Sequence, residues 1–179
     1  MREVAAIEAV FDMPLPMKGT MTDWNIPYMT DILHKVLFIY MRRNPFYVIQ
    51  SLLTVRLDYD GDLRAWHSYK PPEYFFPKGR NPYEQVAGQV YFTKVAVEKG
   101  LERVANERKL VVDYEEFCQQ PEGVFEQITD RFQQQGHPAG WSYACAVSSE
   151  PPRRVSMAEN DMEQNVAAYG DFSGETLVL

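Results

Sequence analysis

The stretch Val36-Leu-Phe-Ile-Tyr-Met-Arg-Arg-Asn-Pro-Phe-Tyr-Val-Ile-Gln-Ser51 joins an uninterrupted apolar run to two arginines and an Asn-Pro pair. The run from Val36 to Met41 shows no polar alternation, which is typical of a parallel-sheet strand covered on both faces. Asn44 is a favoured N-cap and Pro45 a favoured first helical residue, so a helix is predicted from there to about residue 57. A strand followed at once by a helix indicates an α/β fold.

The junction between this strand and helix is a candidate anion site. Ligands of open α/β sheets bind beyond the carboxyl ends of the strands, where Arg42 and Arg43 lie. The helix N-terminus adds backbone N–H donors, and a guanidinium can donate two hydrogen bonds to a phosphate. Ser51 follows Asn44 by seven residues, close to two turns, and is expected to face the arginines. The alternative is that both arginines pair with surface acids and Ser51 merely occupies the helix.

Composition restricts the class of protein. The 179 residues are 45% hydrophobic and 24% charged, as expected for a single soluble globular domain spanning residues 1–179. The net charge of −7 argues against general binding to nucleic acid or to an anionic membrane, so an anion site must be a local basic pocket. Cys118 and Cys145 fit no metal-ligand spacing and no disulfide framework, which favours a reducing, cytoplasmic location. The chain shows neither an apolar run of membrane length nor a signal peptide.

Strand and helix patterns alternate along the chain, which predicts a mainly parallel sheet flanked by helices. The segment Val4–Phe11 is either a strand or a short helix. The segment Trp66–Asn81 is rich in aromatic residues and prolines, and is predicted to be an ordered loop over an apolar surface. Ser156 is the expected N-cap of the last helix. The predicted elements are strands 36–41 and 110–114 and helices 26–34, 45–57, 82–106, 121–136 and 156–169.

Two segments resemble the sulfotransferases that use 3′-phosphoadenosine 5′-phosphosulfate (PAPS). The second nucleotide signature of that family is a strand, then Arg, Asn or Asp, often Pro, and a Ser eight positions after the Arg. Arg43-Asn44-Pro45 and Ser51 reproduce this spacing, and in the family this Arg and Ser hold the 3′-phosphate. The run Lys109-Leu-Val-Val-Asp-Tyr-Glu-Glu-Phe117 is similar to a later family segment. That similarity makes Tyr114 a candidate nucleotide contact, with a Tyr packed at the strand end as the alternative.

The family's first signature, a Pro-Lys/Arg-Ser-Gly-Thr-Thr loop that cradles the 5′-phosphosulfate, has no clear counterpart. Pro16-Met-Lys-Gly-Thr-Met-Thr22 looks superficially like it, but only 23 residues separate Gly19 from Arg43. The resemblance therefore implies a partial P-loop NTPase-like sulfotransferase fold that lacks the first strand and its phosphate loop, a truncated or degenerate domain. A compressed loop at residues 16–22 is the alternative.

By this resemblance the chain would bind PAPS or adenosine 3′,5′-bisphosphate and transfer sulfate to a hydroxyl or amine of a small molecule or glycan. The candidate catalytic groups are Lys18 and His67, although Lys18 also fits a solvated loop lysine. Arg153-Arg154 could correspond to the family's late basic loop. Family members need no metal, and the sequence contains no ligand cluster.

Other classes of function remain open from the sequence. A non-catalytic sulfotransferase-like module could bind a nucleotide or a partner protein, and an exposed apolar patch beside the sheet would favour it. A nucleotide kinase is disfavoured because the chain has no Gly-x-x-x-x-Gly-Lys-Ser/Thr loop. The acceptor, the catalytic base and the oligomeric state stay undetermined, with a homo-oligomer as one alternative.

Overall fold

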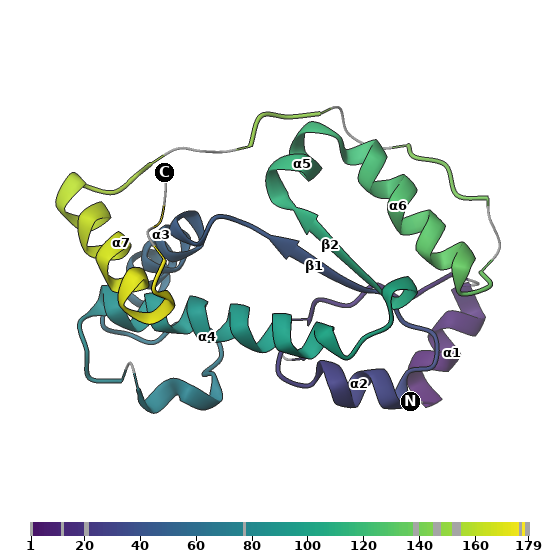
Figure 1. The fold of residues 1–179 in the computed structure, drawn as a ribbon, viewed down its shortest axis with the longest axis horizontal. Helices are drawn as coiled ribbons and strands as arrows, with labels where there is room; N and C mark the ends of the chain where they lie inside the picture. The colour runs from purple at the N-terminus through teal and green to yellow at the C-terminus, as the bar shows by residue number, and fades with distance from the viewer. Residues whose placement is uncertain are drawn as a thin grey trace.

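The computed structural model describes residues 2–11, 13–19, 22–76, 78–137, 140–144, 148–151, 155–175 and 177. Within these ranges the chain forms a two-stranded parallel sheet surrounded by helices, which confirms a mixed α/β class (Figure 1). Strands β1 (Phe38–Arg42) and β2 (Lys109–Asp113) pair in register, with Phe38 opposite Lys109 and Arg42 opposite Asp113. The helices are α1 (Arg2–Phe11), α2 (Ile26–Ile32), α3 (Pro45–Val55), α4 (Pro82–Glu102), α5 (Tyr114–Gln119), α6 (Pro121–Gln134) and α7 (Glu159–Ser173). Shorter turns are η2 (Arg56–Asp60), η3 (Pro72–Phe75) and η4 (Asn106–Arg108).

Side-chain caps start two helices where the sequence predicts them. Asn44 Oδ1 accepts a hydrogen bond from the Phe46 amide at 3.0 Å, so α3 begins directly after β1. At α4, Asn81 Oδ1 accepts from the Glu84 amide at 2.9 Å, and a Glu84 carboxylate oxygen accepts from the Asn81 amide at 3.1 Å. This reciprocal capping box satisfies N–H groups that the first turn would otherwise leave unpaired.

Val4–Phe11 falls within a helix, α1, which decides between the two alternatives that the sequence left open. Two local predictions differ from the structure. The last helix begins at Glu159 after the N-cap Ala158, so the prediction of Ser156 as N-cap was wrong. The amide of Ser156 instead donates to the Gln50 side chain at 3.0 Å, which ties the segment before α7 to α3. The second difference is the π-helical turn η2, which continues the helix beyond Val55.

The largest hydrophobic cluster lies beside the sheet, where α3, α4 and α7 meet. Its central side chains come from the predicted stripes of α3 and α4 and from the last helix. α7 packs along the N-terminal half of α4, as the yellow and teal helices of Figure 1 show. The fully buried members include Ile49, Leu53, Val86, Ala87 and Tyr169.

Each strand of the sheet is covered on one face only. Side chains alternate along a strand, so Phe38 and Tyr40 of β1 face α4, where they pack against Val97 and Leu101. Leu110 and Val112 of β2 face the opposite side, where α6 covers them with Val124 and Ile128. Figure 1 shows the two helices on opposite sides of the strands.

The remaining apolar side chains of the sheet are exposed, namely Ile39 and Met41 on β1 and Val111 on β2. They are 45%, 40% and 45% exposed. The prediction that the strand after Val36 is covered on both faces was therefore wrong, because α4 lies under β1 and α6 over β2.

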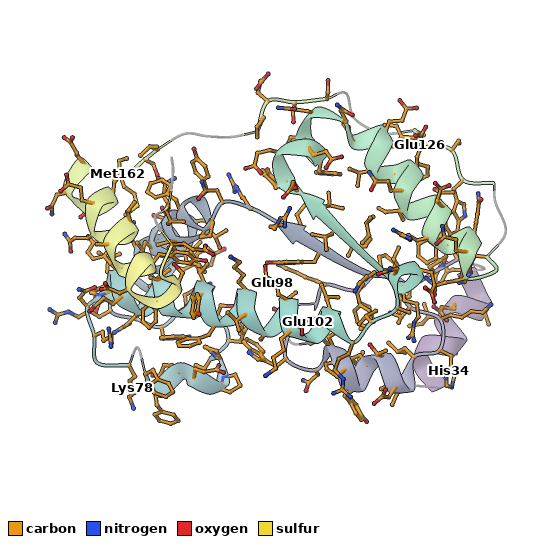
Figure 2. All side chains as sticks on the ribbon, in the orientation of Figure 1. His34, Lys78, Glu98, Glu102, Glu126 and Met162 are labelled. Carbon is orange, nitrogen blue, oxygen red and sulfur yellow. The ribbon has the colours of Figure 1, made fainter. Side chains whose placement is uncertain are left out.

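The aromatic segment before α4 is packed on its inner side and exposed on its outer side. The rings of Trp66 and Tyr74 meet edge to face at 4.5 Å, and the Arg56 guanidinium lies 5.2 Å from the Trp66 ring. Phe75 and Phe76 are 76% and 70% exposed, so they do not cover an apolar surface as predicted. Figure 2 shows Lys78 at the outer edge of the same loop. In the described ranges no helix combines the length and apolar character needed to cross a membrane.

Candidate functional site

The carboxyl ends of β1 and β2 are joined by an ion pair. Arg42 Nε lies 2.8 Å from one Asp113 carboxylate oxygen, and Nη2 lies 2.9 Å from the other. The guanidinium holds the pKa of the Asp113 carboxyl below its usual value, and the same pairing raises the pKa of Arg42. Arg42 therefore matches the alternative given above, in which the arginine pairs with a surface acid.

Arg43 lies instead between two aromatic rings that belong to two different helices. Its guanidinium carbon is 4.5 Å from the centre of the Tyr114 ring and 5.2 Å from that of Tyr47. Tyr114 is the first residue of α5, directly after β2, and Tyr47 lies in the first turn of α3. Tertiary structure thus brings together Arg43 and Tyr114, two residues that the sequence selected from separate segments.

The start of α3 adds partial positive charge to the same region. α3 begins at Pro45 beside the sheet's carboxyl end, where the Phe46 amide donates to Asn44 Oδ1 at 3.0 Å and the Tyr47 amide to the Asn44 carbonyl at 3.1 Å. The pKa of Tyr114 is raised, chiefly by its hydrogen bond with Cys118, while the neighbouring positive charge of Arg43 acts in the opposite direction. A planar guanidinium can donate two parallel hydrogen bonds to one phosphate.

Ser51 occupies an exposed position in the middle of α3. It follows Tyr47 by four residues, so it lies on the same side of the helix, one turn further from the sheet. Because Tyr47 is the α3 side chain that contacts Arg43, Ser51 shares the helix face that Arg43 approaches. Its role as a phosphate contact stays a prediction.

The two candidate catalytic groups lie on other segments. Lys18 is exposed in the segment before α2. His67 Nδ1 lies 3.1 Å from an Asp60 carboxylate oxygen, and the His67 carbonyl accepts a hydrogen bond from the Gln89 amide group at 3.2 Å. These contacts anchor His67 to η2 and α4, and the catalytic roles of Lys18 and His67 stay predictions.

The segment before α7 connects the two helices that border Arg43. The Ser149 amide donates to the Cys118 carbonyl of α5 at 2.7 Å, and the Ser156 amide donates to Gln50 of α3. The chain between these anchors therefore links α5 to α3. Arg153 and Arg154, the predicted basic loop, lie outside the described residues.

A hollow of about 260 Å³ lies between the sheet and α4 and was not anticipated from the sequence. Its charged lining includes Glu98 and Glu102 of α4, and Figure 2 shows Glu98 between the helix and the strands. The basic groups are already engaged, since Arg42 pairs with Asp113 and Lys109 Nζ donates to the Leu101 carbonyl at 2.9 Å. The sequence feature that could have indicated this hollow was the four-residue spacing of Glu98 and Glu102, which places both on one side of a predicted long helix.

The described residues contain no group of three or more His, Cys, Asp or Glu side chains that could hold a metal ion. No protein-family model matches the chain, and neither a curated protein nor a solved structure shows significant similarity to it. The sulfotransferase resemblance therefore stays a prediction from the sequence.

Proposed function

We propose that this chain binds the nucleotide of PAPS at the carboxyl end of its parallel sheet, as part of a sulfotransferase domain with a partial P-loop NTPase-like fold. The observation that carries the proposal is the position of Arg43, between the Tyr47 and Tyr114 rings and beside the first turn of α3. The family signature assigns Arg43 and Ser51 to the 3′-phosphate and Tyr114 to the same region.

The chemistry at the junction of β1 and α3, around Arg43, suits a dianionic phosphate. The α3 N-terminus contributes partial positive charge, Arg43 offers a charged fork, and Ser51 offers a hydroxyl on the adjoining helix face. Arg42, the second cation at the sheet's end, is already neutralised by Asp113. The spacing of the family signature assigns Arg43 to the phosphate.

In the proposed reaction an acceptor oxygen or nitrogen attacks the sulfur of PAPS in line. The bond between sulfur and the bridging phosphate oxygen breaks, adenosine 3′,5′-bisphosphate leaves, and the acceptor proton passes to a general base. Positioned cations stabilise the charge that develops on the leaving phosphate. Lys18 is the candidate for that charge stabilisation and His67 the candidate base; the acceptor is a small molecule or glycan.

The direct test is thermal unfolding with and without adenosine 3′,5′-bisphosphate. At a tenfold excess over the dissociation constant, binding to the folded state stabilises it by about 1.4 kcal/mol, which raises Tm by roughly 3–5 °C for a chain of this size. We expect Arg43→Ala to abolish the shift and Ser51→Ala to reduce it.

Arg103→Ala is the matched control for this test. Arg103 is an exposed arginine after the end of α4, at the amino-terminal side of β2, so its loss removes one positive charge away from the proposed site. We expect the Arg103→Ala protein to keep the full nucleotide shift. A shift that survives Arg43→Ala would assign the nucleotide to another site.

A non-catalytic sulfotransferase-like module is the second candidate function. The observation that favours it is the half-covered sheet, since Ile39 and Met41 are exposed apolar side chains on one face, of the kind that marks interfaces, and Val111 is exposed on the other face. Such a module would bind adenosine 3′,5′-bisphosphate without turnover. Release of adenosine 3′,5′-bisphosphate from PAPS in the presence of a hydroxyl or amine acceptor distinguishes the enzyme from this module.

A further inference from the structure

His67 and Asp60 form a hydrogen-bonded pair, and its chemistry decides which nitrogen of the histidine carries the proton. His67 Nδ1 lies 3.1 Å from an Asp60 carboxylate oxygen. An ionised carboxylate only accepts hydrogen bonds, so Nδ1 is the donor and holds the proton. In the neutral imidazole the other nitrogen, Nε2, then holds the lone pair that a general base needs.

This second nitrogen is accessible to solvent. The His67 and Asp60 side chains are 33% and 34% exposed, so the pair lies at the protein surface. Within the described part of the chain, His67 Nε2 makes no hydrogen bond, and it is not among the buried side-chain nitrogens that lack one. A hydroxyl or amine that arrives from solvent can therefore reach Nε2.

The backbone beside His67 is held in an unfavourable conformation. Ser68 has a φ of 68°, the one positive value among the non-glycine residues that the structure describes. The buried Gln89 side chain donates to the His67 and Tyr69 carbonyls at 3.2 Å each, and so fixes the chain on both sides of Ser68. Strained positions of this kind persist only where the surrounding structure imposes them, and they cluster at functional sites.

Asp60 is positioned by the turn η2, which is π-helical and ends at this residue. Turns of this type are rare and are frequent at functional sites. Arg56, the first residue of η2, is fully buried, and its Nε and Nη2 have no hydrogen-bond partner among the described residues. Burial lowers the pKa of the Arg56 guanidinium, and the negative charge of Asp60 acts in the opposite direction. Arg56 and Asp60 therefore attract each other within one turn, which helps to hold the carboxylate in place.

We propose that Asp60 is a positioning residue for His67: it keeps the proton on Nδ1, so that Nε2 takes the proton of the attacking acceptor hydroxyl or amine. The proposal rests on the proposed function for the identity of the reaction. The acceptor O–H or N–H bond breaks as the acceptor atom bonds to sulfur, and the proton passes to Nε2. Adenosine 3′,5′-bisphosphate leaves with the electron pair of the broken sulfur–oxygen bond. Asp60 stabilises the resulting imidazolium without taking its proton.

The tautomer of His67 tests the pair without any substrate. Nitrogen-15 NMR of the neutral imidazole distinguishes the Nδ1–H form from the Nε2–H form, and the signals lost in His67→Gln identify this residue among the three histidines. We expect the Nδ1–H form in the unmodified protein and the Nε2–H form, which a free imidazole favours, in Asp60→Ala. Asp58→Ala is the matched control, because Asp58 is an exposed aspartate of the same turn, and it should keep the Nδ1–H form. An Nε2–H form in the unmodified protein overturns the proposal.

The rate of PAPS turnover separates positioning from a purely structural role. With phenol and glucosamine as hydroxyl and amine acceptors, Asp60→Ala should lower kcat about tenfold or more, and His67→Gln about a hundredfold or more. Both variants should keep the KM for PAPS and the thermal shift with adenosine 3′,5′-bisphosphate. Asp58→Ala should keep the kcat of the unmodified protein. An Asp60→Ala protein with an unchanged kcat overturns the proposal.

The proposed function and this proposal fail separately. A protein without nucleotide shift or turnover overturns the proposed function, and the pair is then decided by the rate at which diethyl pyrocarbonate acylates His67, measured by mass spectrometry. We expect faster acylation in the unmodified protein and in Asp58→Ala than in Asp60→Ala, because the carboxylate stabilises the cationic acylated ring. Equal rates overturn the pair. If Asp60→Ala does not fold, Asp60→Asn, which keeps the size of the side chain, replaces it with the same expectations.

Discussion

Arg42 and Asp113 hold the carboxyl ends of the two strands together by two hydrogen bonds, at 2.8 and 2.9 Å. The two residues are also partners in the sheet register, so the ion pair extends the backbone ladder at its last position. By engaging Arg42, this pair leaves Arg43 as the arginine beside Tyr114 and the start of α3.

The Arg42–Asp113 pair predicts a pH-dependent contribution to stability. The pKa of Asp113 is lowered in the folded state, so the stabilisation is present above its ordinary value and is lost as the pH falls through the lowered value. Both side chains are about half exposed, at 52% and 47%, which limits the contribution to about 0.5–1 kcal/mol. Asp113→Asn should lower the free energy of unfolding by this amount near pH 7, and by less near pH 3, in urea titrations. Asp130→Asn, an exposed aspartate on α6, should show no such difference.

The core between α3, α4 and α7 predicts a contrast between two leucines one turn apart. Leu53 is 2% exposed within this cluster, whereas Leu57 is 51% exposed on η2. Leu53→Ala should reduce the free energy of unfolding by about 2–4 kcal/mol, because it removes buried apolar atoms and leaves a cavity. Leu57→Ala should change it by no more than about 0.5 kcal/mol. Similar losses for the two variants would place the core elsewhere.

The capping box of α4 predicts a specific cost for Asn81→Ala. The variant leaves the Glu84 amide without its side-chain acceptor and should cost about 1 kcal/mol in urea unfolding. Asn106→Ala is the control, since Asn106 lies within η4 and does not act as its N-cap. The structure would be contradicted at this position if Asn106→Ala were the more damaging change.

The stacking of Arg43 on Tyr114 predicts how Tyr114 variants bind nucleotide. Tyr114→Phe keeps the ring and should bind adenosine 3′,5′-bisphosphate nearly as well as the unmodified protein. Tyr114→Ala removes a cation–π contact of about 0.5–1 kcal/mol and should weaken binding about two- to fivefold in titration calorimetry. Equal affinity for all three proteins would show that Tyr114 does not orient Arg43 for the ligand.

Local chemistry made several features predictable from the sequence. Asn44-Pro45 and Asn81-Pro82 start α3 and α4 because a side-chain cap and a fixed proline φ act within a few residues. The apolar run after Val36 formed a strand for the same kind of reason, although its exposure was not predicted. Ser156 is not the N-cap because α7 begins further along the chain, after Ala158, and the Ser156 amide donates to Gln50.

By itself the sequence determined where β1, the junction at Arg43-Asn44-Pro45 and the main helices lie, because these depend on residues adjacent in the chain. Tertiary structure decided that Arg42 pairs with Asp113, which aromatic rings border Arg43, and which side chains of β1 remain exposed. Those outcomes depend on Asp113, Tyr114 and α6, which lie some seventy or more residues away and whose positions are set by packing. Burial and pairing are properties of the assembled chain, so a local pattern could not predict them.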